Sequence, residues 1–91
     1  MQQDFTIERL QKIIANAPMK KGGNRKTLVE RLFKEIEPYL SKGITSVEDE
    51  LDFCSLVELV LDESGVQGAD ARVDTLGQIY DAIGFTHFWK G

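Results

Sequence analysis

The chain has 91 residues, of which 42% are hydrophobic and 29% charged, and these values are typical of one soluble globular domain spanning residues 1–91. No apolar run approaches the ~20 residues that cross a bilayer, and the first ten residues lack the basic and apolar regions of a secretory signal. A single cysteine excludes an internal disulfide and fits a reducing cytoplasm, which we predict as the location of the protein.

The net charge of −4 is unevenly distributed along the chain. Residues 1–46 contain nine basic and five acidic residues, which gives a charge of +4. Residues 47–91 contain two basic and ten acidic residues, which gives a charge of −8. Such an asymmetry concerns partners and solubility rather than the fold.

The first predicted helix covers residues 4–17. Thr6 is a suitable N-cap, and Phe5 and Leu10 have the spacing of a hydrophobic staple. Pro18 ends the helix, because the residue before a proline is pushed out of helical geometry. The apolar face of this helix consists of Ile7, Leu10, Ile13, Ile14 and Ala17.

A loop over residues 18–24 leads to the second predicted helix, which runs from an Asn24 N-cap to about Leu40. Pro38 lies within this stretch and lacks a backbone N–H, which predicts either a kink there or a helix end at Glu37. The apolar side of the helix consists of Leu28, Val29, Leu32, Phe33, Ile36, Tyr39 and Leu40.

The third predicted helix, over residues 45–64, is the most hydrophobic, and we expect it to be central to the fold. Thr45 and Glu48 have the spacing of a capping box, and Gly65 marks the end. The apolar residues spread over more than half of the helix circumference: Val47, Leu51, Phe53, Cys54, Val57, Val60 and Leu61. The remaining stripe is polar and mostly acidic, with Leu59 in its middle: Glu48, Asp52, Ser55, Asp62 and Glu63.

The last predicted helix covers residues 71–83, with Asp70 as its N-terminal cap and Gly84 as its C-terminal cap. We expect its inward face to consist of Val73, Leu76, Ile79, Tyr80 and Ile83. Gly77 inside the helix costs about 1 kcal/mol relative to alanine, which predicts the close approach of another helix. Residues 85–91 contain three aromatic side chains, which either fold back onto the core or form an exposed anchor for a partner.

No segment alternates between polar and apolar residues in the manner of a strand. The sequence therefore predicts an all-α fold, a compact bundle of four main helices with short connections and an aromatic C-terminal tail.

The side chains that most catalytic and metal sites need are scarce. His87 and Cys54 are the only histidine and cysteine, so the sequence indicates no metal site and no cofactor. A nucleophilic pair of Cys54 and His87 is the one catalytic arrangement to consider. Because Cys54 falls on the apolar face of the third helix, an inert buried thiol is the simpler interpretation. We predict that the protein is not an enzyme.

Residues 20–27 are the best candidate for contact with an anion. Their glycines allow close backbone approach, and the following helix start presents free N–H groups. The basic side chains are Lys20, Lys21, Arg25 and Lys26. The stretch matches no phosphate-binding motif, and a solvated basic loop is the simpler interpretation. The turn at residues 40–45 has the length of a helix-turn-helix turn, but the acidic residues that follow it conflict with DNA phosphates.

Two functional interpretations remain. In the first, the protein is an adaptor or inhibitor that presents an acidic helical face to a basic surface of a partner protein. In its most specific version, the acidic face imitates the charge of nucleic acid and blocks a nucleic-acid-binding protein. The residues of this face are Glu48, Asp49, Asp52, Leu59, Asp62 and Glu63. In the second, the protein is a nucleic-acid-binding accessory or regulatory protein that uses the basic loop 20–27 and the second helix. Neither interpretation involves a membrane, and the oligomeric state stays open.

Overall fold

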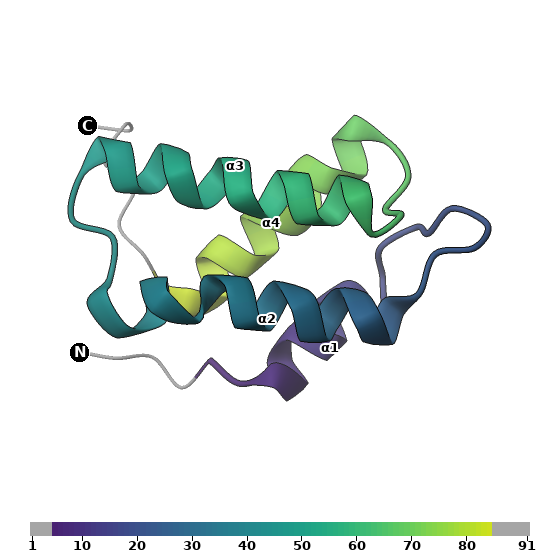
Figure 1. The fold of residues 1–91 in the computed structure, drawn as a ribbon, viewed down its shortest axis with the longest axis horizontal. Helices are drawn as coiled ribbons and strands as arrows, with labels where there is room; N and C mark the ends of the chain where they lie inside the picture. The colour runs from purple at the N-terminus through teal and green to yellow at the C-terminus, as the bar shows by residue number, and fades with distance from the viewer. Residues whose placement is uncertain (1–4, 85–91) are drawn as a thin grey trace.

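The computed structural model describes residues 5–84, which form four α helices joined by short connections, without a strand (Figure 1). The helices are α1 (Ile7–Ile14), α2 (Arg25–Lys42), α3 (Val47–Glu63) and α4 (Ala69–Ile83). Both α1 and α3 pack against α2 and α4, so the four helices enclose one core. This arrangement confirms the predicted all-α bundle. The aromatic residues of the C-terminal tail lie outside the described residues.

Every helix contributes to the core through one face. The residues with almost no solvent exposure include Leu10, Ile14, Leu28, Leu32, Ile36, Phe53, Val57, Val60, Leu61 and Ile79. Phe53 lies between two other rings, with its centroid 5.3 Å from that of Tyr39 and 5.8 Å from that of Tyr80. Both pairs are edge-on, a geometry that the charge distribution of aromatic rings favours. The rings therefore connect α2, α3 and α4 at one level of the bundle.

The N-terminal caps of α1 and α2 are those that the sequence predicts. The Thr6 hydroxyl accepts a hydrogen bond from the Arg9 N–H at 3.3 Å, and the Asn24 side chain accepts one from the Thr27 N–H at 3.0 Å. The predicted cap of α3 is wrong by one residue. Ser46, not Thr45, is the N-cap and accepts from the Asp49 N–H at 3.1 Å.

Helix α1 is shorter than predicted and ends at Ile14 rather than at residue 17. The side chain of Arg25 stabilises this end, because its Nη1 donates a hydrogen bond of 2.5 Å to the carbonyl oxygen of Ile14. Carbonyl groups in the last turn of a helix have no partner within the helix, and a cationic donor satisfies one of them well. The start of α2 thus caps the end of α1.

Helix α2 continues through Pro38 to Lys42, so the alternative in which it ends at Glu37 is wrong. A proline inside a helix deprives the carbonyl four residues earlier of its hydrogen bond. Here that carbonyl belongs to Lys34, and both Lys34 and Pro38 are exposed. Water can therefore take the place of the missing donor, which lowers the cost of the proline.

The connection between α1 and α2 is joined to the connection between α3 and α4, at the same end of the bundle (Figure 1). The N–H of Lys20 donates to the carbonyl of Gly65 at 2.6 Å, and the N–H of Gln67 donates to the carbonyl of Pro18 at 2.9 Å. A Cβ atom on Gly65 would lie 3.1 Å from the Cα of Gly23. The two connections therefore touch through their backbones, and glycine at this contact is a packing requirement.

The rotation of α3 about its axis differs from the prediction. Val47 and Leu51, which the apolar pattern places inward, are exposed, whereas Glu50 is buried with 1% exposure. The carboxylate of Glu50 accepts a hydrogen bond of 2.5 Å from the phenol of Tyr80 on α4. A buried carboxylate needs such partners. Since consecutive helix residues are about 100° apart, an inward Glu50 turns Leu51 towards solvent.

The start and the outer face of α4 also differ from the prediction. The N-cap is Gly68 rather than Asp70, and its position has no side-chain cap. Val73 is exposed, and Thr75 is buried in its place. The expected close approach of another helix at Gly77 is wrong, because no atom of the described residues lies within 4 Å of a Cβ built there. Gly77 thus weakens α4 without a packing benefit within residues 5–84.

Replacing Gly77 by alanine should stabilise the protein. The position is exposed, helical and open, so the substitution removes the backbone entropy cost of glycine, roughly 0.5–1 kcal/mol. Urea denaturation followed by circular dichroism measures the change. Gly65→Ala is the control and should destabilise, because Gly65 has φ +101° and contacts Gly23. Destabilisation by Gly77→Ala would show that another group packs against Gly77 and contradict the open surface at this position.

The Tyr80–Glu50 hydrogen bond should make the stability depend on alkaline pH. Burial, with the acceptor Glu50 second, raises the pKa of the Tyr80 phenol above its ordinary value near 10. Unfolded Tyr80 releases its proton from about pH 10 upward while folded Tyr80 keeps it, so stability is full below pH 10 and falls above it. Tyr80→Phe should cost about 1.5–3 kcal/mol at pH 7 and flatten this alkaline decline. An equally steep decline in Tyr80→Phe would contradict the assignment.

Candidate functional site

The most distinctive surface of the structure is the solvent-facing side of α3. We call it the outer face of α3 and define it by six exposed residues: Glu48, Leu51, Asp52, Ser55, Glu58 and Leu59. At about 100° per residue these six side chains span roughly a third of the helix circumference. They lie opposite the buried residues that anchor the helix in the core.

Two leucines protrude from this outer face. Leu51 is 60% exposed and Leu59 is 52% exposed, and both are among the few large hydrophobic side chains of residues 5–84 with this much exposure. The other two are Val47 on α3 and Val73 on α4. Single exposed apolar side chains are ordinary on protein surfaces. Three of these four side chains belong to α3 and one to α4, with none on α1 or α2, so within residues 5–84 the exposed large apolar side chains are concentrated on α3.

Three of the predicted acidic residues are engaged in contacts with neighbouring elements. Glu63 forms an ion pair of 2.6 Å with Arg31 of α2, and Asp62 forms one of 3.5 Å with Arg72 of α4. Asp49 lies 3.8 Å from the ammonium of Lys42 and accepts hydrogen bonds from Thr45. Asp49 and Glu63 lie beside the outer face, whereas Asp62 lies on the outer side of α3, seven residues after Ser55.

The hydrogen bonds from Thr45 to Asp49 have an electrostatic consequence. Together with the more distant Lys42 they hold the pKa of the Asp49 carboxyl below its ordinary value, the backbone N–H of Thr45 being the largest cause. Asp49 is therefore a structural residue at the start of α3, although the sequence assigns it to the binding face.

Three further acids of α3 expose their carboxylates to solvent: Glu48, Asp52 and Glu58. Within residues 5–84, the side chains of Glu48, Asp52 and Glu58 form no ion pair and no hydrogen bond. All three belong to the outer face and surround its two leucines. The structure therefore adds Glu58 and Leu51 to the predicted site. It also separates the outer acids from Asp49, Asp62 and Glu63, whose charges are partly neutralised by Lys42, Arg72 and Arg31.

The predicted anion contact is only partly available. Arg25 is occupied in capping α1, and the backbone of Lys20 bonds to Gly65. The side chains of Lys20, Lys21 and Lys26 are exposed, while the start of α2 is already capped by Asn24. Gly23 of this loop serves the contact between the two connections, so the structure gives this glycine a role that does not involve an anion.

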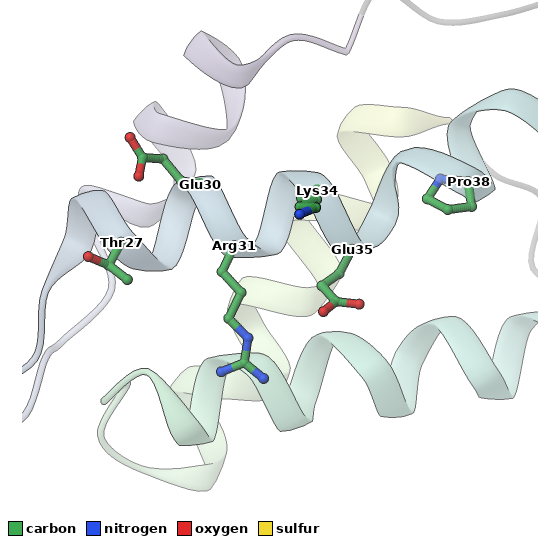
Figure 2. A pocket seen from close by; sticks show the side chains of 6 residues that line it. All are labelled: Thr27, Glu30, Arg31, Lys34, Glu35 and Pro38. Atoms are coloured by element: carbon green, nitrogen blue, oxygen red, sulfur yellow. The ribbon is translucent and has the colours of Figure 1, made fainter.

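The outer side of α2 contains a shallow open groove with mixed charge (Figure 2). Its lining residues are Thr27, Glu30, Arg31, Lys34, Glu35 and Pro38. Arg31 extends from α2 towards α3, where it meets Glu63 (Figure 2). Positive and negative side chains alternate here, and the groove has no enclosed apolar floor. It lacks the features of a small-molecule site.

The thiol of Cys54 is half-buried between α3 and α4. Burial, followed by the nearby Glu50 and Glu58, raises the pKa of this thiol above its ordinary value. A raised pKa keeps the thiol protonated and therefore weakly nucleophilic. His87, the other member of the candidate pair, lies outside the described residues. Within residues 5–84 no group of three or more His, Cys, Asp or Glu side chains is arranged to hold a metal ion.

Comparisons with protein-family models, with curated proteins and with solved structures find no match for this chain. Among the helices of residues 5–84, none combines the length and the apolar character that crossing a membrane requires.

The exposure of Leu51 and Leu59 predicts small effects on stability. Leu51→Ala and Leu59→Ala should each change the free energy of unfolding by less than about 1 kcal/mol, because little buried surface is lost. Leu61→Ala, at a fully buried position of the same helix, should cost about 2–5 kcal/mol. Thermal and urea unfolding of the three variants provide the comparison. If either exposed variant lost as much free energy of unfolding as Leu61→Ala, that leucine would have to lie in a buried contact.

Proposed function

We propose that the protein is a non-enzymatic interaction module, an adaptor or inhibitor, that presents the outer face of α3 to a basic surface of a partner protein. The observation that carries this proposal is the pair of exposed leucines, Leu51 and Leu59, surrounded by carboxylates that have no ion-pair partner among residues 5–84. Asp62 and Glu63 extend the acidic character towards the end of the helix.

Each part of the surface has a distinct role in this proposal. Free carboxylates attract a basic partner over several ångströms and speed its approach, which is how charged rims act at interfaces. The leucines lose water on contact and supply the apolar anchor that charge alone does not provide. Glu63 and Asp62 contribute less, since Arg31 and Arg72 already offset their charge. The centre of binding therefore lies in the middle of α3.

A partner that normally binds nucleic acid suits this surface. Such proteins expose clusters of Lys and Arg that neutralise phosphates. The carboxylates of Glu48, Asp52 and Glu58 would occupy those clusters, and the protein would act as an inhibitor by competition. Nucleic-acid binding by the basic loop 20–27 is the alternative. The engagement of Arg25 with α1 leaves that alternative with fewer available cations.

The test is a pull-down from the source cell after nuclease treatment, with wild-type protein and two charge-matched variants. Glu48→Lys combined with Asp52→Lys should abolish recovery of a specific partner. Asp70→Lys combined with Asp74→Lys on the exposed side of α4 changes the charge equally and should preserve recovery. Circular dichroism verifies the fold of both variants.

Binding kinetics with the recovered partner then separate the two contributions. The α3 charge variant should mainly slow association, less so at high salt. Leu59→Ala should weaken affinity by about 1–3 kcal/mol. A partner lost by nuclease treatment, or lost only when Lys20, Lys21 and Lys26 are neutralised, would contradict the proposal and support nucleic-acid binding.

A further inference from the structure

The shape of the outer face of α3 specifies the kind of element that binds it. Resting on the proposed function, we propose that this face binds a single basic, amphipathic α-helix of a partner protein, which crosses α3 over Ser55.

Ser55 lies at the centre of the outer face. Leu51 and Leu59 are four residues before and after it, and Asp52 and Glu58 are three residues before and after it. Side chains at these spacings are neighbours on a helix surface. Because serine has the shortest side chain of the five, we infer a depression at Ser55, between two leucines in one direction and between two carboxylates in the other.

The dimensions of this depression fit one helix. Eight residues separate Leu51 from Leu59, which corresponds to about 12 Å along the helix axis. An α-helix with its side chains has a diameter of about 10–12 Å. A helix crossing over Ser55 can therefore contact both leucines with one apolar stripe, in the manner of ridges packed into grooves.

The charges determine what flanks that stripe. Asp52 and Glu58 lie on opposite sides of Ser55, and Glu48 lies one turn before Asp52. None of the three has an ion-pair partner within the described chain. A helix with Lys or Arg on both sides of its apolar stripe would pair with carboxylates at both edges. An acidic or nucleic-acid partner would meet repulsion at the same positions.

A second copy of this chain does not satisfy the same surface. In an antiparallel pair of α3 helices centred on Ser55, Leu51 of one copy would face Leu59 of the other. The same symmetry would bring Asp52 against Glu58, and Glu48 against Asp62. Like charges face each other at every acidic position, so self-association is opposed while the leucines remain available to a basic helix.

The experiment uses two synthetic peptides of equal composition as probes. One carries leucines in a single helical stripe with lysines on both sides, and the other has the same residues reordered so that the leucines surround the helix. With the full chain at pH 7 and 0.15 M salt, the amphipathic peptide should bind at least tenfold tighter than the reordered one. Amide shifts in NMR spectra should centre on residues 48–62.

Variants locate the binding more closely. Ser55→Arg fills the depression and adds a positive charge, and should weaken the amphipathic peptide at least tenfold. Ser41→Arg, on the exposed side of α2, makes the same change elsewhere and should have little effect. Leu51→Ala combined with Leu59→Ala should reduce the affinity to that of the reordered peptide. Val73→Ala on α4 is the apolar control and should leave it unchanged.

Several results would overturn this proposal. They are equal affinity for both peptides, no binding of the amphipathic peptide, shifts that map away from α3, or wild-type dimers in sedimentation at pH 7. The proposed function fails separately. Suppose that the pull-down recovers a partner that the α3 charge variant no longer binds, while the amphipathic peptide does not bind. This result would support the acidic interaction face and contradict only the proposal that its ligand is a helix.

Discussion

The bundle depends on the contact between its two loop connections. Hydrogen bonds from Lys20 to Gly65 and from Gln67 to Pro18 hold the α1–α2 connection against the α3–α4 connection. This contact brings the end of α1, the start of α2, the end of α3 and the start of α4 to one place. With the ends held there, the apolar faces of all four helices point into one core. The outer face of α3 is the side of that helix that stays exposed to solvent.

The sequence predicted the features that depend on neighbours along the chain. Thr6 and Asn24 were identified as caps because a cap acts on the N–H groups two or three residues later. The buried sides of α1 and α2 followed from apolar spacing. The acidic stripe on α3 around Leu59 was also confirmed as exposed. Contacts between distant residues escaped the prediction: Arg25 donates to the carbonyl of Ile14 at the end of α1, and Gly23 meets Gly65 in a connection more than forty residues away.

The largest error concerned α3, and it has a physical explanation. An apolar count places Leu51 inward, and it gives no reason to bury Glu50, because burial of a carboxylate is costly. The hydrogen bond from Tyr80, thirty residues later, offsets that cost, and nothing near Glu50 in the sequence announces it. The same rotation exposes Leu51 beside Leu59, which the sequence places on the polar stripe of the helix while leaving its exposure open. The predicted aromatic C-terminal tail, residues 85–91, lies outside the described residues.

The buried bond between Glu50 and Tyr80 has a consequence at the opposite side of the helix. If α3 turned about its axis, Glu50 would leave its donor and core side chains would move into solvent, so the orientation of α3 is fixed from inside. Ser55 and its two leucines are therefore held in one direction before any partner arrives. A surface ordered in advance loses little conformational entropy on binding. A polar contact in the core thereby preorganises an apolar contact at the surface.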